Sequence, residues 1–209
     1  MPIKYILVDI DGTLTAVNIK GGLEKSLSGH FYDMVEGHPE LPNDICISKI
    51  LPEYGIKIED YSTKVLADMK QHTFIRPDAQ SFLRWCVENK KALYTATTNS
   101  KYISLLKLSC GGFREEDFSG FFGGDVFNDP LGKFSPAFYP SILKALNSDG
   151  SDVVMIGDEW IRDSEPARLA GIKYTIHIDV NAENECIEKE PGAFIVNSLE
   201  FAKDIIENA

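Results

Sequence analysis

Two aspartates follow an apolar run near the start of the chain. The segment from Ile3 to Val8 has the length and β-branched content of a buried strand, and Asp9, Asp11 and Gly12 come directly after it. Open α/β sheets bind ligands at such strand ends. Residues two apart on an extended chain face the same way, so the two carboxylates are expected to share a crevice and to repel each other unless a cation lies between them. Mg²⁺, which prefers oxygen ligands, suits this position.

Two simpler interpretations of this segment must be weighed. A calcium loop of the EF-hand type would need an acid near Thr13, a glycine in place of Leu14 and a glutamate in place of Lys20, and none of these is there. A surface turn, in which an aspartate caps its own backbone and Gly12 takes a positive φ, stays open for the segment alone. The rest of the chain has to decide between the turn and a cation site.

Length and composition predict one domain with a modest insertion. A chain of 209 residues, 44% of them hydrophobic, can hold one core of ordinary size but not two full α/β domains. No stretch approaches the roughly 20 apolar residues that span a membrane. Because Asp9 interrupts the first apolar run, the amino terminus does not resemble a signal peptide, and we expect a cytoplasmic protein with no membrane partner.

Charge and metal-binding residue types exclude several functions. The formal net charge of −11 repels polyanions, so nucleic acid is not an expected partner, although a small anion can bind in a locally basic pocket. The four histidines form no metal-ligand pattern, and no two cysteines have the spacing of a zinc or redox motif. We therefore expect reduced thiols and no zinc site. The cysteines are Cys46, Cys86, Cys110 and Cys186.

Helical periodicity after the first strand predicts a helical insertion. The three amphipathic stretches are residues 22–36, 43–51 and 58–71. Arg76, Pro77 and Asp78 then interrupt the pattern, and a new helix is expected from Ala79 to about Asn89. This pattern divides the chain into an α/β core of residues 1–15 and 75–209 and a small helical unit of residues 16–74.

Strand-like segments alternate with helices through the second part of the chain. The expected strands are Ala92–Thr95, Phe121–Phe127, Val153–Gly157, Tyr174–Ile178 and Phe194–Val196. Such alternation indicates right-handed βαβ units. The predicted fold class is therefore α/β, with a doubly wound, mainly parallel, Rossmann-like sheet and a small helical unit inserted after its first strand.

Three further segments place polar groups after predicted strands. Hydroxyls at Thr95, Thr97 and Thr98 suit a phosphate oxygen, although threonine is common at strand ends. Lys133 precedes a helix whose dipole its charge opposes, although a lysine there is usually a surface charge. Asp158 ends a buried strand as Asp9 does.

A second aspartate follows the last of these strands at a distance of five residues. Asp163 can reach back across a short loop toward Lys133 or toward the waters of a metal bound near Asp158. The alternative role for Asp163, capping the helix that follows, stays open.

In order and spacing, these groups resemble the four motifs of the haloacid dehalogenase (HAD) superfamily. The resemblance comprises Asp9-Ile-Asp-Gly-Thr-Leu, the hydroxyl after a middle strand, Lys133, and Gly157-Asp158 with Asp163. The segment Arg76-Pro77-Asp78-Ala79 looks like the return from the cap in this superfamily. The insertion is similar to the helical cap of phosphoglycolate-phosphatase-like and β-phosphoglucomutase-like members.

The resemblance implies phosphoryl transfer through an aspartyl-phosphate. Asp9 would be the nucleophile and Asp11 the acid and base. Mg²⁺ would be held by the Asp9 carboxylate, the Asp11 backbone carbonyl and Asp158, with Asp163 in support.

The phosphoryl oxygens would be bound by the hydroxyl of the second motif, a neighbouring amide and the lysine. Alignment of the apolar residues Ala92-Leu93-Tyr94 with the second motif favours Thr95 as the hydroxyl and Ala96 as the amide, with Lys133 as the lysine. If the motif is instead read as a Thr-Asn pair, the hydroxyl is that of Thr98, which precedes Asn99. We take Thr95 and Ala96 as the expected residues, with Thr97 and Thr98 as open alternatives.

A helical cap over the site implies a small phosphorylated metabolite as substrate. Among superfamily members a phosphatase is expected, and a sugar-phosphate mutase with the same motifs is the open alternative. A dehalogenase is disfavoured because it would not need Asp11. A non-catalytic binding module is disfavoured because it would be expected to lose Asp9, Asp11 or Asp158.

Overall fold

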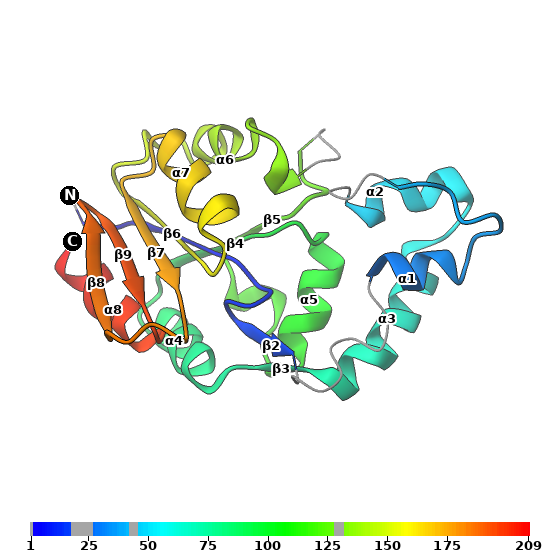
Figure 1. Ribbon diagram of the computed structural model, residues 1–209, viewed down its shortest axis with the longest axis horizontal. Coiled ribbons are helices and arrows are strands. Elements are labelled where there is room, and N and C mark those ends of the chain that lie inside the picture. Colours follow the sequence, from blue (N-terminus) through cyan, green and yellow to red (C-terminus); the bar gives the residue numbers. More distant parts are fainter. Residues whose placement is uncertain (1, 18–26, 42–45, 128–131) are drawn as a thin grey trace.

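A seven-stranded sheet forms the centre of the molecule (Figure 1). The computed structural model describes residues 2–17, 27–41, 46–127 and 132–209. The strand order is β5-β4-β1-β6-β7-β9-β8, and all pairs are parallel except β8 with β9. The sheet strands are β1 (Tyr5–Val8), β4 (Ala92–Ala96), β5 (Gly120–Phe122), β6 (Val153–Gly157), β7 (Tyr174–Ile178), β8 (Cys186–Glu190) and β9 (Ala193–Val196). The predicted doubly wound α/β fold is confirmed.

Helices cover both faces of this sheet, with α6 and α7 on one side and α4 and α8 on the other (Figure 1). The helices of this part are α4 (Pro77–Glu88), α5 (Lys101–Ser109), α6 (Phe138–Leu146), α7 (Glu165–Leu169) and α8 (Glu200–Asn208), with short turns η2 (Glu115–Asp117), η3 (Gly132–Phe134) and the π-helical η4 (Trp160–Ser164).

The two central strands β1 and β6 consist of apolar residues apart from Tyr5 and Gly157, and they are buried on both faces. In β1, Ile6 and Val8 pack into the core under α4 and α8, and Leu7 packs into the core under α6. All five residues of β6 are buried as well. This pattern is typical of a parallel sheet covered on both sides. It places the ends of β1 and β6 side by side, since the two strands pair directly.

Helix α4 begins two residues earlier than expected. Pro77 fits the first turn of a helix because that turn needs no amide donor, so the helix starts at Pro77 and not at Ala79. Four residues on one face, at helical spacing, enter the core: Ala79, Phe82, Leu83 and Cys86. Asp78 in the first turn accepts hydrogen bonds from the Leu199 amide (3.0 Å) and the Ser198 hydroxyl (3.2 Å) and so joins α4 to the start of α8.

The inserted helices are connected to the sheet by a two-stranded ribbon that the sequence analysis did not predict. Strands β2 (Thr15–Val17) and β3 (Thr73–Ile75) pair antiparallel. Between them lie α1 (Leu27–Tyr32), α2 (Ile47–Ile50), η1 (Leu51–Tyr54) and α3 (Ile58–His72). We call these four elements the cap. The predicted boundaries at 15/16 and 74/75 fall inside the ribbon, and the division into domains stays a prediction.

The cap has an apolar cluster of its own. It includes Phe31 of α1, Leu51 of η1 and Tyr61 of α3, together with Ile103, which comes from α5 beside the sheet. Helix α5 therefore contacts the cap and the core at once. Within the described residues α1 is shorter than the predicted 22–36 helix, and residues 22–26 and 43–45 of the predicted helices lie outside the described residues.

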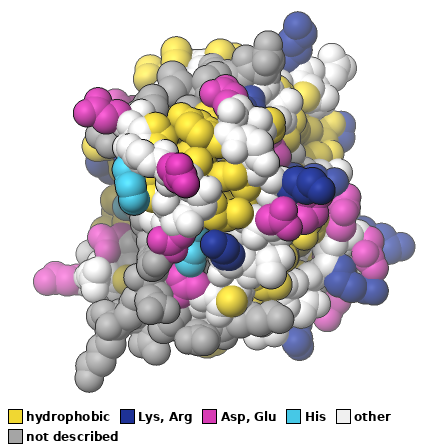
Figure 2. All heavy atoms as spheres, turned by 90° about the vertical axis from the view of Figure 1, so that its right-hand side faces the viewer, with side chains coloured by type: hydrophobic (Ala, Val, Ile, Leu, Met, Phe, Trp, Pro, Cys, Tyr) yellow, Lys and Arg dark blue, Asp and Glu magenta, His cyan; other side chains and the backbone are white. Residues whose placement is uncertain are grey.

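The outer side of the cap is mixed in character. Figure 2, which faces this end of the molecule, shows hydrophobic side chains gathered near the centre with charged side chains around them. Among the described helices, none combines the length and apolar character that crossing a membrane would require.

Two strands differ from the expected ones for local reasons. Strand β5 ends at Phe122 and not at Phe127, because the chain turns at Gly123 and Gly124. The Gly124 amide donates to the Asn99 carbonyl (3.0 Å), and a Cβ at Gly124 would lie 2.6 Å from the Thr98 carbonyl oxygen. Because these residues are glycines, the turn can pack directly against the backbone of the loop that follows β4. Strand β8 was not predicted, since its charged residues are all exposed at the sheet edge.

Candidate active site

Asp9, Lys133 and Asp163 form a buried ionic group at the carboxyl end of the sheet. Asp9 follows β1, and its amide donates to the Ile156 carbonyl of β6 (2.9 Å), which fixes its position. The Lys133 ammonium donates to Asp9 Oδ1 (2.6 Å) and to Asp163 Oδ1 (2.7 Å). All three residues are less than 8% exposed. The lysine therefore bridges two buried carboxylates that lie far apart in the sequence.

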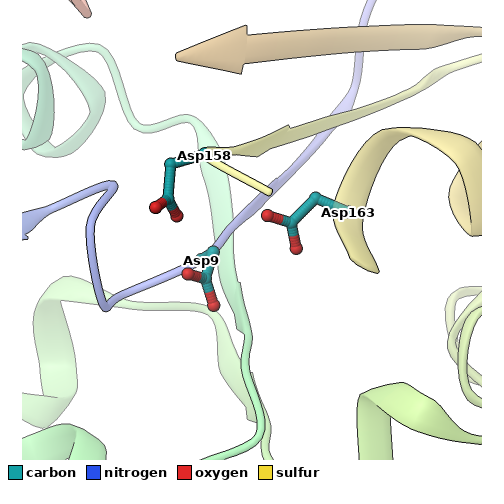
Figure 3. Close-up of side chains that lie close together, drawn as sticks. All are labelled: Asp9, Asp158 and Asp163. Carbon is teal, nitrogen blue, oxygen red and sulfur yellow. The ribbon is translucent and has the colours of Figure 1, made fainter. Parts of the chain in front are cut away.

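A third carboxylate completes a group that can hold a metal ion. Carboxylate oxygens of Asp9, Asp158 and Asp163 lie within 4.8 Å of one another. Figure 3 shows the three side chains gathered in one place, where they extend from the ends of β1 and β6 and from η4. An all-carboxylate set of oxygen donors suits a hard divalent cation such as Mg²⁺.

Close backbone packing positions these carboxylates. A Cβ at Gly12, whose φ is +76°, would lie 2.0 Å from Asp158 Oδ2, and a Cβ at Gly157 would lie 2.0 Å from Asp163 Oδ2. Thr13 donates to Asp158 Oδ1 (3.0 Å), and the Glu159 amide donates to Asp163 Oδ2 (3.0 Å). Both glycines therefore allow a backbone approach that any side chain would block.

The charges of this group are set by burial and by Lys133. Burial, with smaller contributions from the charges of Asp163 and Asp11, raises the pKa of Asp9 to about 8 against the opposing effect of Lys133. Burial also raises the pKa of Asp158. Burial alone would lower the pKa of Lys133, but Asp163 and Asp9 outweigh it and hold that pKa well above its usual range. One lysine therefore does not fully compensate three carboxylates, which is the electrostatic condition that a bound cation relieves.

Asp11 has different partners from Asp9, although the two are only two residues apart. The Lys107 ammonium donates to both of its carboxylate oxygens (2.6 and 2.7 Å), and Asn99 Nδ2 donates to Oδ2 (2.6 Å). Burial opposes the ionised form, but Lys107 and Asn99 outweigh it and lower the pKa of Asp11. The Asp11 carboxylate is not part of the three-carboxylate group, and Lys107 compensates its charge. The cation expected between the paired aspartates stays a prediction.

The threonines after β4 have three different positions. Thr95 lies inside the strand, fully buried, and no described residue hydrogen-bonds its hydroxyl. The Thr97 hydroxyl accepts from Asn99 Nδ2 (2.9 Å) and so shapes the loop. Thr98 lines the same cavity as the aspartates. Ala96 ends the strand, and its side chain packs in the core with Leu7.

The expected binding of the phosphoryl group by Thr95 and Ala96 stays a prediction. The Thr95 hydroxyl is buried and has no hydrogen-bond partner among the described residues, and Ala96 was expected to act through its backbone amide, which the burial of its side chain does not affect. Thr98, one of the open alternatives, takes the cavity position.

The cavity at this edge of the sheet has a volume of about 220 Å³. It is lined by Asp9, Asp11, Thr98, Lys133, Glu159, Arg162 and Asp163. The Arg162 guanidinium pairs with the Glu159 carboxylate (2.9 Å) and lies 4.6 Å from the centre of the Phe134 ring. Tyr139 of α6 donates to the Arg162 carbonyl (3.0 Å) and holds this loop in place. The cavity therefore combines carboxylates with three groups that can bind an anion.

Four residues in or beside the site were not expected from the sequence: Glu159 and Arg162 of the cavity, and Asn99 and Lys107, which contact Asp11. Glu159 and Arg162 lie inside the Gly157–Asp163 segment, but nothing in that spacing distinguishes a cavity-lining side chain from a surface one. Asn99 could have been found from its place after Thr98.

The burial of Lys107 could have been suspected from the sequence, because it lies on the same helix face as Ile103, Ser104 and Leu108. All three of these residues are buried. A lysine on the apolar face of an amphipathic helix implies a buried partner.

A larger cavity, of about 710 Å³, lies elsewhere, between the start of α5 and the η1 and α3 part of the cap. Its lining includes Leu51, Ile56, Tyr102 and Leu105, and none of the aspartates at positions 9, 11, 158 and 163 contributes to it. Size alone therefore does not identify the reactive site.

Comparison with solved structures gives matches over nearly the full chain. The HAD phosphatase from Thermococcus onnurineus has a TM-score of 0.64 at 18% identity, with 98% of each chain covered. YfnB from Bacillus subtilis, solved bound to magnesium, has a TM-score of 0.63 at 16% identity, with 99% of each chain covered. A predicted phosphatase from Clostridium acetobutylicum has a TM-score of 0.62 at 23% identity, covering 99% of this chain and 100% of that one. At these identities the likeness shows a shared fold.

Sequence comparison identifies the family. No curated protein sequence matches the chain. The family model described as haloacid dehalogenase-like hydrolase matches residues 3–171, which include every residue of the candidate site. The resemblance seen in the four motifs is thereby confirmed, and the chain belongs to the haloacid dehalogenase-like hydrolase family.

Proposed function

We propose that this protein is a Mg²⁺-dependent phosphatase that hydrolyses a small phosphorylated metabolite through an aspartyl-phosphate on Asp9. The observation that carries the proposal is the position of the Asp9 carboxylate, which lines a small polar cavity, is bridged by Lys133 to Asp163 and lies within 4.8 Å of an Asp158 carboxylate oxygen. Such an arrangement supplies a nucleophile, a metal site and an anion-binding cation within one cavity.

The metal is assigned to Asp9 and Asp158, with the Asp11 backbone carbonyl as a third protein ligand and Asp163 in support. Asp163 is better suited to support than to direct ligation, because both of its oxygens already accept hydrogen bonds, from Lys133 and from the Glu159 amide. When bound there, Mg²⁺ would neutralise the carboxylates and stabilise negative charge on the phosphoryl oxygens. YfnB, which shares this fold, was solved bound to magnesium, and this supports Mg²⁺ as the cation.

The first chemical step forms the aspartyl-phosphate. An Asp9 carboxylate oxygen attacks phosphorus, the bond between phosphorus and the leaving-group oxygen breaks, and that oxygen takes a proton from the Asp11 carboxyl group. Lys107 and Asn99 favour the ionised form of Asp11 before the ester binds, and the negative charge of the bound ester raises the pKa of Asp11 toward protonation.

Lys133 and the Thr98 hydroxyl donate to the phosphoryl oxygens as charge spreads over them. Arg162, at the cavity edge, adds a positive charge near the same anion.

The second step restores the enzyme. Asp11, now a carboxylate, takes a proton from a water molecule whose oxygen attacks phosphorus. The bond from phosphorus to Asp9 breaks, inorganic phosphate leaves, and Asp9 is again a carboxylate. A cavity of about 220 Å³ suits a phosphoryl group with a small organic part, which supports a metabolite and not a macromolecule as substrate.

A panel of substrates tests this function. With Mg²⁺ we expect phosphate release from p-nitrophenyl phosphate and from small sugar and glycolate phosphates, and loss of that release when EDTA removes the metal. Following isomerised sugar alongside free phosphate separates hydrolysis from the mutase alternative. Chloride release from 2-chloropropionate would instead indicate a dehalogenase. Absence of phosphate release from every ester at saturating Mg²⁺ would contradict the proposal.

The threonine assignment has its own test. Thr98→Ala removes a hydroxyl that faces the phosphoryl group, and we expect kcat/KM to fall by about 10²-fold. Thr95→Val keeps the shape of a buried side chain whose hydroxyl has no described partner, so activity should be unchanged and stability equal or higher. Steady-state kinetics and urea unfolding of both variants check this. The opposite pattern would assign the phosphate position to Thr95 and not to Thr98.

A further inference from the structure

We propose that Lys107 is a positioning residue that holds the Asp11 carboxyl group in place for proton transfer to and from the substrate. The inference rests on the proposed function, because it concerns the acid and base of that reaction. It concerns a residue of α5 that belongs to none of the four motifs. The observations that carry it are the contacts of Lys107, its burial and the exposure of Asp11.

The contacts of Lys107 converge on one carboxylate. Its ammonium makes three hydrogen bonds, two to Asp11 (2.6 and 2.7 Å) and one to Asn99 Oδ1 (3.2 Å). Asn99 in turn donates through Nδ2 to Asp11 Oδ2 (2.6 Å). The three side chains therefore form a closed ring of hydrogen bonds. Because an ammonium group has three donors, this ring uses all of them.

Helix α5 holds the lysine at the position from which it reaches Asp11. The Lys107 side chain is 5% exposed, and its neighbours on the same helix face are Ile103, which packs in the cap cluster, and Leu108, which packs under the sheet. Burying an ammonium group costs free energy that an apolar residue would avoid. Packing alone would favour leucine or methionine here, so the contact with Asp11 is what distinguishes lysine at this position.

Asp11 needs such support because part of its side chain faces the cavity. That side chain is 47% exposed, whereas that of Asp9 is 10% exposed and fixed by Lys133. A half-buried carboxylate with one side free can adopt more than one rotamer, and proton transfer requires the one within hydrogen-bond reach of the reacting oxygen. Lys107 and Asn99 restrict Asp11 without touching Asp9, Asp158 or Lys133. Loss of Lys107 should therefore impair proton transfer and leave metal binding and nucleophilic attack intact.

Leaving groups of different acidity test this inference. Glycerol 3-phosphate releases an alkoxide that needs a proton, whereas p-nitrophenyl phosphate releases a stable phenolate that does not. For Lys107→Met we expect kcat/KM with glycerol 3-phosphate to fall by about 10²-fold and kcat/KM with p-nitrophenyl phosphate to stay within about threefold of wild type, because only the first reaction depends on the acid. Because Asp11 is also the base of the second step, kcat and KM for p-nitrophenyl phosphate should fall together. Lys107→Arg, which keeps the charge and the donors, should recover part of the loss.

A double-mutant cycle separates this role from a general structural one. Asp11→Asn should show the same dependence on the leaving group, and the double variant Lys107→Met/Asp11→Asn should be no slower than Asp11→Asn alone, because both changes remove the same function. Lys101→Met, on the same helix but paired with the exposed Glu115, is the matched control and should behave as wild type. If Lys107→Met does not fold, Lys107→Gln, which can still donate to Asn99, takes its place in the cycle.

The outcomes distinguish this inference from the proposed function. Three results would overturn the role of Lys107 while leaving the phosphatase assignment in place. They are an equal loss of kcat/KM with both esters, additive losses of kcat/KM in the double-mutant cycle, and no loss of kcat/KM in the Lys107 variants. A wild-type enzyme that hydrolyses neither ester would contradict the proposed function, and the inference with it.

Discussion

Replacing the Asp9 carboxylate by an amide should abolish phosphate release. In the proposed reaction Asp9 forms the bond to phosphorus, and an amide cannot do so, so we expect kcat of Asp9→Asn to fall by at least about 10⁴-fold. The other groups of the cavity remain, so weak binding of the ester should persist. Steady-state release of phosphate from p-nitrophenyl phosphate in saturating Mg²⁺ measures the loss.

The same variant should keep its fold. Burial raises the pKa of Asp9, so its ionised form is held in the structure at a cost that an amide does not incur. Circular dichroism and urea unfolding should therefore show a folded protein. Asp149→Asn, an exposed aspartate before β6, is the matched control and should keep full activity. Activity of Asp9→Asn comparable to that of wild type would contradict the role of Asp9.

Replacing Lys133 by methionine should reduce both stability and activity. Its ammonium is the shared partner of Asp9 and Asp163, and both carboxylates would stay buried without it. Removing one partner of a buried ion pair typically costs about 3 to 5 kcal/mol of unfolding free energy. The loss of a donor to the phosphoryl group should also lower kcat by about 10³-fold.

The stability loss in Lys133→Met should depend on pH and on Mg²⁺. Without the lysine, the pKa of Asp9 in the folded protein rises further above the unfolded value of about 4, because Lys133 opposes the effect of burial. Unfolding at neutral pH then releases protons, so the deficit relative to wild type is small at acidic pH and grows as the pH rises. Mg²⁺ should restore more stability to the variant than to wild type, because it supplies positive charge to the same carboxylates.

Urea unfolding at several pH values, with Mg²⁺ and with EDTA, measures these effects. Lys144→Met, on the exposed side of α6, is the control for loss of a lysine and should unfold as wild type does. A deficit that is independent of pH and of Mg²⁺ would mean that Lys133 acts through packing, contrary to our account.

The parts of the fold that the sequence predicted well are those whose local pattern matches their burial. Strands β6 and β7 lie where they were expected, Val153–Gly157 and Tyr174–Ile178, because they are apolar runs bounded by turn residues. Strand β8 is exposed and charged, so its residues carry no strand pattern, and only its pairing with β9 makes it a strand. The ribbon of β2 and β3 depends likewise on pairing between segments far apart in the sequence.

The candidate site was predictable where its residues follow strands directly. Asp9 and Asp158 were expected at neighbouring strand ends, and their carboxylates do lie together. Asp163 was expected to reach back toward Lys133, and the two form a hydrogen bond of 2.7 Å. These placements follow from parallel strands that end at one edge of a sheet.

The remaining site residues depend on contacts that a local pattern does not contain. The choice between Thr95 and Thr98 required the true end of β4, and element boundaries are the weakest part of any sequence interpretation. Lys107 reaches Asp11 from 96 positions along the chain. Its role depends on how α5 packs between the cap and the sheet, which only the three-dimensional structure reveals.

The most direct test of the central claim is to find the phosphoryl group on Asp9. Asp11→Asn, which lacks the base for the second step, is mixed with p-nitrophenyl phosphate and Mg²⁺, quenched in acid within one turnover and digested for mass spectrometry. We predict one phosphoryl group on the peptide that contains Asp9, and none when Asp9 is also replaced by asparagine. Rapid release of nitrophenol with no phosphoryl group on that peptide, or with the group on another residue, would contradict the account.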